Sequence, residues 1–493
     1  MICVRISLVL LLLVTVCQAA AKVTNGHMYF LSSKGDDHSD GSFKYPWKTI
    51  SRLNEIILQP GDQVFLRGGD TFTGTLSLDS NDAGSETKPI MITAYGKGYA
   101  WIDAGDSSGV LVKQAGYIHI SRLGLKGSGR KNGNTQHGFA ISYSHHVNVS
   151  EIEVKGFQKA GLMIYSCDSV RVANVYAHEN GFAGILADGE YQQRNTRRIH
   201  ITDCRAENNP GDPTNFTNHS GNGILAGNCS NILIEYCSAT NNGWDMPRTG
   251  NGPVGIWCYE ADSVIIQHCI AWQNKTSAGG GDGGGFDLDG GVTHSIIQYC
   301  LSYENQGSGF GIFQYDGASN WHDNTIRFCI SENDGAVSPA GAGVFIWNSS
   351  MDTSQFKRCY FYNNTIYNKK AAAISYEAKS ANTGFIFSNN IFIAKDSLIT
   401  GTGGDAVNQS NSWYSFNLKM NDTVSWLPRF VNPGKATVAN PRKLREWKAY
   451  KISQAARSSH KGADIKKLFD IDAGKYDFNG ILLKENFIGA CAW

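Results

Sequence analysis

The segment GGGDGGGFDLDGG, residues 279–291, places acidic side chains at a spacing that suits acid/base chemistry. Asp287 and Asp289 are two residues apart, so on a β-strand they project from one face with Cα atoms about 6.5–7 Å apart. Carboxyl groups this close separate their pKa values, as general acid/base cleavage of a glycosidic bond requires. The surrounding glycines allow close approach to the backbone. We interpret Asp287 and Asp289 as candidate catalytic residues, with Glu260 as a possible third.

Two other interpretations of these acids stay open. Asp282, Asp287 and Asp289 are candidate ligands of Ca²⁺, which takes about six to eight oxygen ligands. Alternatively, the acids only accept hydrogen bonds from the backbone of turns. The first interpretation requires no cofactor, and Ca²⁺ belongs to the second. His145 and His146 are adjacent and are expected to point to opposite faces of the chain, which argues against a shared metal ion.

The acids belong to a repeated unit in which a glycine precedes a short alternating strand. Successive units start 23, 23, 39, 32, 30, 24 and 34 residues apart, which indicates a basic period of 22–23 residues with insertions. Short apolar strands and turns at this period predict a β-solenoid rather than helical repeats. The units begin at Gly138, Gly161, Gly184, Gly223, Gly255, Gly285, Gly309 and Gly343.

Aromatic and acidic residues occupy outward positions beside the acid pair. Aromatic rings stack on the C–H faces of sugars, and carboxylates bind sugar hydroxyls. The alternative is that these rings only stabilise the sheet through contacts between strands. The predicted sugar-binding residues are Asp188, Trp257, Tyr259, Phe313, Tyr315 and Trp347.

Long insertions fall just before the glycine of several units, at residues 210–222, 243–254, 275–284 and 336–342. Insertions in a solenoid gather on its binding face. We therefore expect these loops to form the walls of a groove beside the strands that carry the acids and aromatic residues.

The second half of each unit predicts two columns of stacked side chains, because parallel strands lie about 4.8 Å apart. We expect the cysteines to be free, buried thiols and the amides to hydrogen-bond from rung to rung. The first column contains Val175, Cys204, Cys237, Cys269, Cys300, Cys329 and Cys359. The second contains Asn180, Asn209, Asn242, Asn274, Asn305, Asp334 and Asn364.

The amino terminus has the pattern of a secretory signal, predicted at residues 1–21, with Arg5 before an apolar run and a small-residue cleavage site at Ala19–Ala21. We expect a secreted protein, extracellular or periplasmic, without membrane insertion after cleavage, and a monomer. The 44 basic and 43 acidic residues leave a net charge of +1, which disfavours nucleic acid as a partner.

The opening MYFLSSKGDDHSDGSFKYPWKTISRLNEIILQPGDQVFLRGGDTF and the closing YDFNGILLKENFIGACAW resemble the right-handed parallel β-helix, or pectin-lyase-like, superfamily of secreted bacterial carbohydrate-active proteins. The resemblance covers about residues 27–493. It implies an all-β fold with a capping helix at residues 48–58 and a first rung strand at residues 63–67. The implied organisation is an amino-terminal cap and first rung at 22–90, a β-helix at 91–430 and a carboxy-terminal cap at 431–493.

The chain also partly resembles family 9 polysaccharide lyases, which bind Ca²⁺ through an Asp-Asp-Gly-x-Asp run that GFDLD matches only in part. Those enzymes use a Lys base, and the outward positions after Asp289 contain no Lys. We therefore predict a glycoside hydrolase that acts on a polysaccharide or oligosaccharide. A Ca²⁺-dependent lyase and a non-catalytic glycan-binding protein are the two alternatives.

Overall fold

The computed structural model describes residues 26–338, 341–350, 356–417, 427–452 and 461–491. The predicted signal peptide at residues 1–21 lies outside the described residues. Within this described part of the chain, no helix has both the length and the apolar composition needed to cross a membrane.

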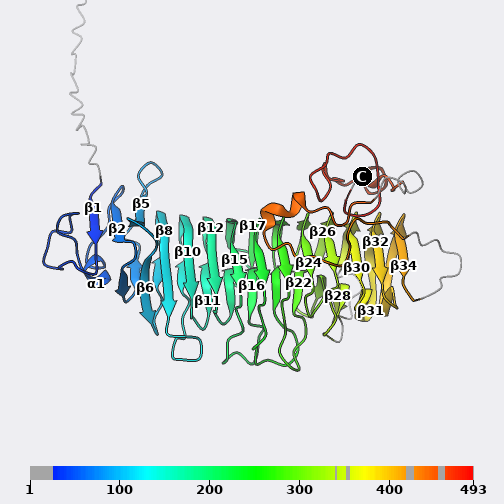
Figure 1. Cartoon of the computed structure of the whole chain (residues 1–493), viewed down its shortest axis with the longest axis horizontal. Helices are drawn as coiled ribbons and strands as arrows, with labels where there is room; N and C mark the ends of the chain where they lie inside the picture. The colour runs from blue at the N-terminus through cyan, green and yellow to red at the C-terminus, as the bar shows by residue number, and fades with distance from the viewer. Residues whose placement is uncertain (1–25, 339–340, 351–355, 418–426, 453–460, 492–493) are drawn as a thin grey trace, which may run out of the picture.

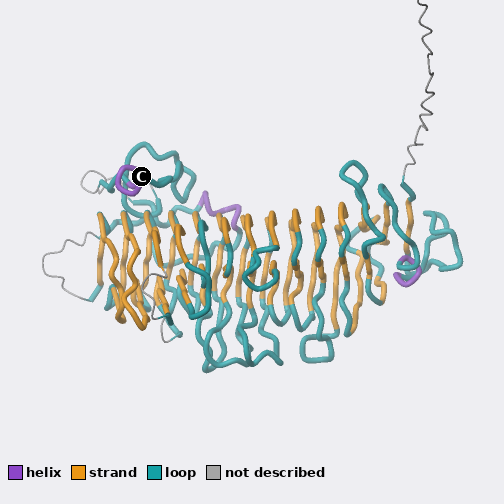
Figure 2. Tube along the Cα trace, turned by 180° about the vertical axis from the view of Figure 1, so that it is seen from behind, coloured by secondary structure: helices purple, strands orange, loops and turns teal. Residues whose placement is uncertain are grey.

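The described chain winds into a right-handed parallel β-helix of 34 strands, which confirms the predicted fold class (Figures 1 and 2). Three stacks of parallel strands run along its axis, and one rung contributes a strand to each stack. The first stack carries the acid pair. It consists of β4 Leu76–Leu78, β7 Val110–Lys113, β9 Phe139–Ser142, β11 Ala160–Tyr165, β13 Ala183–Asp188, β16 Asn222–Gly227, β19 Val254–Tyr259, β22 Gly284–Leu288, β25 Phe310–Gln314, β28 Ala342–Asn348, β31 Ala372–Ser388 and β33 Ile399–Gln409.

The other two stacks complete the cross-section. The second stack consists of β1 Met28–Leu31, β2 Gln63–Arg67, β5 Ile90–Tyr95, β8 Gly116–Gly127, β10 His145–Lys155, β12 Asp168–His178, β14 Thr196–Thr202, β17 Cys229–Glu235, β20 Asp262–Gln267, β23 Ile296–Gln298, β26 Trp321–Arg327 and β29 Phe356–Tyr362. The third consists of β3 Thr71–Thr73, β6 Ala100–Gly105, β15 Arg205–Glu207, β18 Ser238–Thr240, β21 Ile270–Trp272, β24 Leu301–Tyr303, β27 Ile330–Glu332, β30 Thr365–Asn368, β32 Ile391–Ala394 and β34 Ser412–Ser415. Strands β8, β10 and β12 also extend into the third stack, and β31 and β33 into the second.

Alternation along the first stack follows the two-residue period of a strand. Its inward positions form the core, and its outward positions form the floor of the site described below. The fully buried inward side chains are Ile185, Ile224, Ile256, Phe286, Phe310 and Val344. The sequence therefore predicted correctly which side chains of these strands point inward.

Rung-to-rung stacking produces the predicted ladder of buried amides. The Nδ2 group of Asn209 donates to Oδ1 of Asn242 at 2.9 Å, and Asn242 donates to Asn274 at the same distance. Each amide also donates to a backbone carbonyl, as Asn242 does to Ala206 at 3.0 Å. All ten cysteines in the described residues are free and buried, which confirms the interpretation as packed thiols.

The two columns continue differently from the prediction at the last aligned rung. Cys359 pairs with Asn324 in β26, and Asn364 lies beside Cys329, to whose backbone N–H it offers Oδ1 at 2.9 Å. The alignment of Cys359 with Cys329 and of Asn364 with Asp334 was therefore wrong by five residues. Asn364 donates to Asn390 at 3.1 Å, so a second amide ladder takes over the cysteine column from this rung onward.

Replacing one rung of the amide ladder should destabilise the protein strongly. We expect Asn242→Ala to lower the free energy of unfolding by roughly 2–4 kcal/mol, because buried donors on Asn209 and the carbonyl of Ala206 lose their partners. Urea unfolding measures the change, with replacement of the exposed Asn132 by Ala as the matched control. Equal midpoints for the two variants would contradict this expectation.

The helix of the amino-terminal cap is shorter than predicted. Helix α1 spans only Ile50–Leu53, with Thr49 as its N-cap. The backbone N–H of Lys48 donates to Asp37, and that of Leu58 to Asp82, so both ends of the predicted segment 48–58 are held outside the helix. Strand β2 has the predicted bounds, but β1 precedes it and pairs with it.

The carboxy-terminal segment lies along the side of the solenoid rather than over its open end (Figures 1 and 2). It contains the 3₁₀ helix η1, Pro441–Glu446, and helix α2, Ile465–Phe469. Tyr450 packs in a cluster with Leu301 and Tyr367 of the third stack and donates to buried Glu332 at 2.6 Å. Apolar residues on the outside of β24, β27 and β30 therefore require this cover, and the prediction of an end cap at 431–493 is corrected.

Candidate functional site

A cavity of about 730 Å³ opens over the outward face of the first stack, from β19 to β31. Three of the four long insertions project from this edge of the solenoid beneath β16 and β22, opposite the edge that the carboxy-terminal segment covers (Figure 1). All four insertions contribute to the walls, as predicted. The wall residues are Asn218, His219, Arg248, Gly250, Asn251, Gly252, Val254, Gly279, Gly280, Gly281, Asp282 and Ser338.

The strand register brings most of the predicted site residues to the cavity. Trp257, Asp287 and Gly311 occupy equivalent positions on three successive rungs. Gly311 leaves room for the carboxyl group of the preceding rung: a Cβ atom there would lie 2.9 Å from Oδ1 of Asp287. The predicted residues that line the cavity are Trp257, Tyr259, Asp282, Asp287, Asp289, Phe313, Tyr315 and Trp347.

Asp287 is a buried carboxyl group with one oxygen atom that accepts no hydrogen bond. Its side chain is 2% exposed, and among the described residues no group forms a hydrogen bond with its Oδ1. Burial raises the pKa of Asp287 well above its usual range, and the neighbouring Asp289 and Asp282 raise it further. Burial therefore favours the protonated form of Asp287, which can donate a proton to a ligand in the cavity.

Asp289 and Asp282 differ from Asp287 because each accepts a backbone hydrogen bond, from Gly290 and Gly252 respectively, at 2.7 Å. Burial raises the pKa of Asp289 to about 7 and that of Asp282 to about 6, while these hydrogen bonds oppose the rise. Asp289 consequently ionises more readily than Asp287. The cavity thus contains a proton donor beside a carboxyl group that loses its proton as the pH rises through about 7.

Two tyrosine rings reach the cavity because glycines occupy the rung before them. A Cβ atom on Gly227 would lie 2.2 Å from the ring of Tyr259, and one on Gly290 would lie 2.3 Å from Tyr315. The hydroxyl of Tyr259 reaches Asp188, with both oxygen distances at 3.2 Å. Asp188, which was predicted to bind sugar, does not line the cavity: its carboxylate lies behind Tyr259.

Glu260 also lies outside the cavity lining. It follows β19 with a φ of 44°, and its Oε1 accepts from the backbone of Ser319 at 2.8 Å and from Gln192 at 3.2 Å. The turn directs this side chain against Gly291 of the next rung, where a Cβ atom would lie 2.5 Å from its Oε2, and away from the cavity that Asp287 lines. Its charge still contributes to the raised pKa of Asp289.

Sequence reasoning missed several lining residues. His219, in the first wall loop, accepts from Asn222 at Nδ1 (3.0 Å) and lies edge-on to Trp257. Burial lowers the pKa of His219 to about 3, so it is neutral. Glu377 pairs with Trp347, but its unit begins with Ala373 where the other units begin with Gly, so the repeat pattern did not reveal it. The lining residues outside the predicted set of catalytic and sugar-binding residues include Tyr191, Asn218, His219, Arg248, Phe345 and Glu377.

The chain matches one family model, described as "Pel9A-like, right handed beta helix region", over residues 29–333. It is similar to a lacto-N-biosidase of Bifidobacterium longum subsp. longum, with 24% identity in an alignment that covers 82% of this chain. The chain spans 31% of the length of that relative.

Two solved structures share the fold. The GH136 lacto-N-biosidase from Eubacterium ramulus is 19% identical, with a TM-score of 0.52 over 72% of this chain and 67% of that one. The PL6 family alginate lyase AlyGC is 14% identical, with a TM-score of 0.51 over 82% of this chain and 58% of that one. At these identities the likeness concerns the fold alone.

Proposed function

The chain belongs to the Pel9A-like right-handed β-helix family, and from that premise we propose that it is a glycoside hydrolase acting on an oligosaccharide in the cavity of the first stack. The observation that carries the proposal is the carboxyl pair. Asp287 is buried without a hydrogen bond to its Oδ1, and Asp289 has a pKa of about 7 in the same cavity. Cleavage of a glycosidic bond needs one protonated carboxyl group as the acid and one ionised carboxylate as the base or nucleophile.

In the proposed reaction, Asp287 gives its proton to the glycosidic oxygen as the C–O bond breaks. The leaving sugar departs as a neutral alcohol, and positive charge develops at the anomeric carbon. Ionised Asp289 stabilises that charge and acts on the same carbon, either directly or by taking a proton from the attacking water. Water supplies the hydroxyl of the new reducing end in both cases, and no cofactor is required.

The aromatic lining supports a sugar substrate. Tyr259, Tyr315, Phe313 and Trp347 surround the acids, and their rings suit the C–H faces of pyranoses. Loops close the cavity on one side, which favours an oligosaccharide or a chain end over the middle of a polymer. The name of the Bifidobacterium relative makes glycans with lacto-N-biose units the first to test. We also propose that the protein acts as a monomer outside the cell, as its amino-terminal pattern predicts.

The experiment uses purified mature protein, residues 22–493, with a panel of host, plant and algal oligosaccharides. New reducing ends are measured together with ultraviolet absorbance of unsaturated sugars, with and without a chelator. Reducing ends without absorbance are expected, and insensitivity to the chelator is expected with them. Absorbance that disappears on chelation would instead support a lyase in which Asp282, Asp287 and Asp289 bind Ca²⁺. Binding without turnover would support a glycan-binding protein.

The pH dependence of kcat/KM follows from the two carboxyl groups. We expect kcat/KM to rise with pH toward about 7, because Asp289 must be ionised and burial raises its pKa to about 7. It should fall at higher pH, where Asp287 loses the proton that it donates. A profile measured from pH 4 to 9 tests this. A maximum near pH 4, where Asp289 is protonated, would contradict the assignment.

A further inference from the structure

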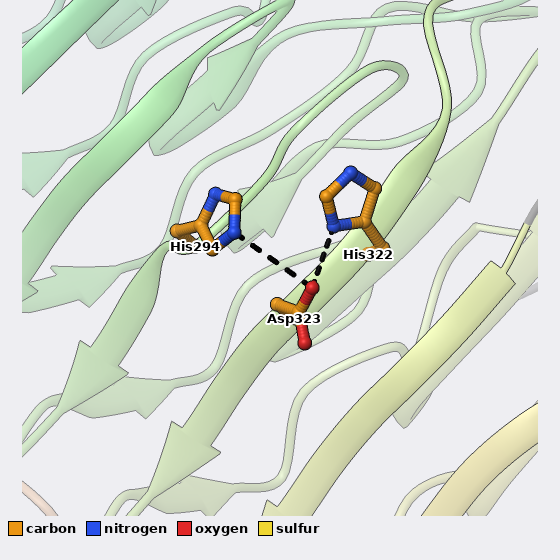
Figure 3. A group of neighbouring side chains, drawn as sticks. All are labelled: His294, His322 and Asp323. Atoms are coloured by element: carbon orange, nitrogen blue, oxygen red, sulfur yellow. Dashed lines mark hydrogen bonds and ion pairs between the residues drawn. The ribbon is translucent and has the colours of Figure 1, made fainter.

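A second group of chemically active side chains lies at the corner between the first and second stacks. It consists of His294, His322 and Asp323, whose candidate ligand atoms all lie within 4.8 Å of one another (Figure 3). Thr293 pairs with His322 on the next rung, which brings His294 beside Asp323. His294 and Asp323 have φ values of 48° and 58°, and this left-handed backbone turns their side chains outward.

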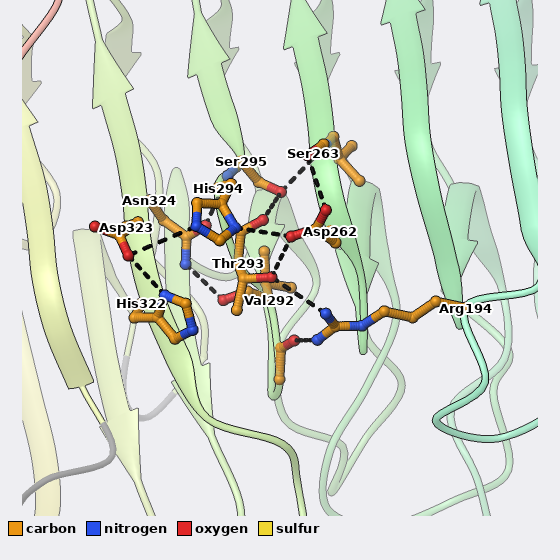
Figure 4. Close-up of polar contacts among 12 residues, drawn as sticks. Arg194, Asp262, Ser263, Val292, Thr293, His294, Ser295, His322, Asp323 and Asn324 are labelled. Carbon is orange, nitrogen blue, oxygen red and sulfur yellow. Dashed lines mark hydrogen bonds and ion pairs between the residues drawn. The ribbon is translucent and has the colours of Figure 1, made fainter.

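The orientation of His294 is set by a carboxylate. Its Nδ1 lies 2.8 Å from Oδ1 of Asp262, which also accepts from the hydroxyl of Thr293 at 2.7 Å (Figure 4). A proton on Nδ1 leaves the lone pair on Nε2, which lies 3.7 Å from Oδ2 of Asp323. A carboxylate behind a histidine is the arrangement that orients metal-binding imidazoles in proteins.

The other two groups converge on the same point. Nδ1 of His322 lies 2.7 Å from Oδ2 of Asp323, and Arg358 on the following rung donates to both oxygens of that carboxylate, through Nε to Oδ1 and through a terminal nitrogen to Oδ2. Two ligands of a tetrahedral Zn²⁺ ion lie about 3.4 Å apart, which falls between the two measured separations, 2.7 and 3.7 Å. We propose that His294, His322 and Asp323 bind a divalent transition-metal ion of the zinc class.

In the bound state, His294 contributes Nε2, Asp323 contributes Oδ2, and His322 contributes Nδ1 with its own proton on Nε2. A hollow of about 420 Å³ is lined in part by His294 and His322, and water in it would complete the coordination. Among the described residues, none lines both this hollow and the oligosaccharide cavity. The ion would therefore link two rungs of the solenoid without taking part in the proposed hydrolysis.

The chain contains an internal control for this proposal. His145 and His146 were expected to point apart, but the φ of 52° at His146 breaks the alternation, and their Nδ1 atoms lie 3.0 Å apart. The earlier expectation is therefore wrong. This pair has two imidazoles but no place in any described group of three possible ligands. It tests whether two neighbouring histidines are sufficient for binding.

The test uses the full mature chain without a polyhistidine tag, stripped of metal by a chelator and then titrated with Zn²⁺. A chromophoric competitor reports the dissociation constant, and thermal unfolding reports the shift in Tm. We expect one ion per chain and a higher Tm with Zn²⁺. His322→Ala should abolish both effects, and Asp262→Asn should weaken binding roughly 10–100-fold by releasing His294. The milder variant His294→Gln should also abolish them and guards against misfolding of His322→Ala.

The double variant His145→Ala/His146→Ala should bind Zn²⁺ as the unmodified chain does. Absence of saturable binding, or its loss in this control but not in His322→Ala, would overturn the proposal. Because no readout depends on glycan cleavage, failure of the metal site and failure of the proposed hydrolase are distinguished.

Discussion

We expect Asp287→Asn to lower kcat on an oligosaccharide roughly 10²–10⁴-fold, because an amide cannot donate the proton that the leaving sugar requires. The buried position of Asp287 and the raised pKa of its carboxyl group make it the donor. Steady-state kinetics on the best substrate of the panel measures the loss.

An aryl glycoside separates the loss of an acid from general damage to the site. Nitrophenolate leaves without protonation, so Asp287→Asn should cleave a nitrophenyl glycoside of the same sugar with nearly the kcat/KM of the unmodified enzyme, because kcat/KM reports the step in which the glycosidic bond breaks. An equal loss on both substrates would contradict the role of Asp287 as the acid.

Stability provides a second check on the same variant. The folded-state pKa of Asp287 is raised, so its contribution to stability is present below its unfolded pKa and is lost as pH rises through the folded value. Asn does not ionise, so the stability of the Asn variant has no such dependence on pH at this position. Asp287→Asn should therefore gain stability relative to the unmodified protein as pH increases, which urea unfolding at pH 5 and pH 8 measures. A relative loss would mean that the carboxylate has partners in the folded state.

The second large effect is expected at Asp289. Asp289→Asn should lower kcat roughly 10²–10⁴-fold on the oligosaccharide and on the nitrophenyl glycoside alike, since both need a carboxylate at the anomeric carbon. The two variants thus differ on one substrate and agree on the other. Asp316→Asn makes the same chemical change at an exposed position outside the cavity lining and should leave both rates unchanged. Cleavage of either substrate by Asp289→Asn at the unmodified rate would refute the assignment.

Much of the site could be predicted because a solenoid repeats. Its two-residue alternation assigns Trp257, Asp287 and Phe313 to the outward face, and their rungs are neighbours in sequence as well as in space. Residues in the wall loops follow no period. His219 and Arg248 therefore reach the cavity through loop conformations that no repeat indicates.

Position on the outward face was not sufficient to predict contact with the cavity. Asp188 has the same alternation as Asp289, yet the ring of Tyr259 lies across Gly227 and screens it. Glu260 is close to Asp289 in the repeat but adopts a positive φ that turns it away. A side chain on another rung decided the outcome for Asp188, and the local backbone conformation decided it for Glu260.

The sequence by itself determined the parallel β-helix, the buried amide ladder, the free cysteines and the pairing of Asp287 with Asp289. These depend on local alternation and on a period that repeats along the chain. Only the tertiary structure decided how the carboxyl groups ionise and which histidines meet, because both depend on neighbours supplied by other rungs. Gly311 leaves room for the Asp287 carboxyl in a buried site, and His294 joins His322 and Asp323 from the preceding rung.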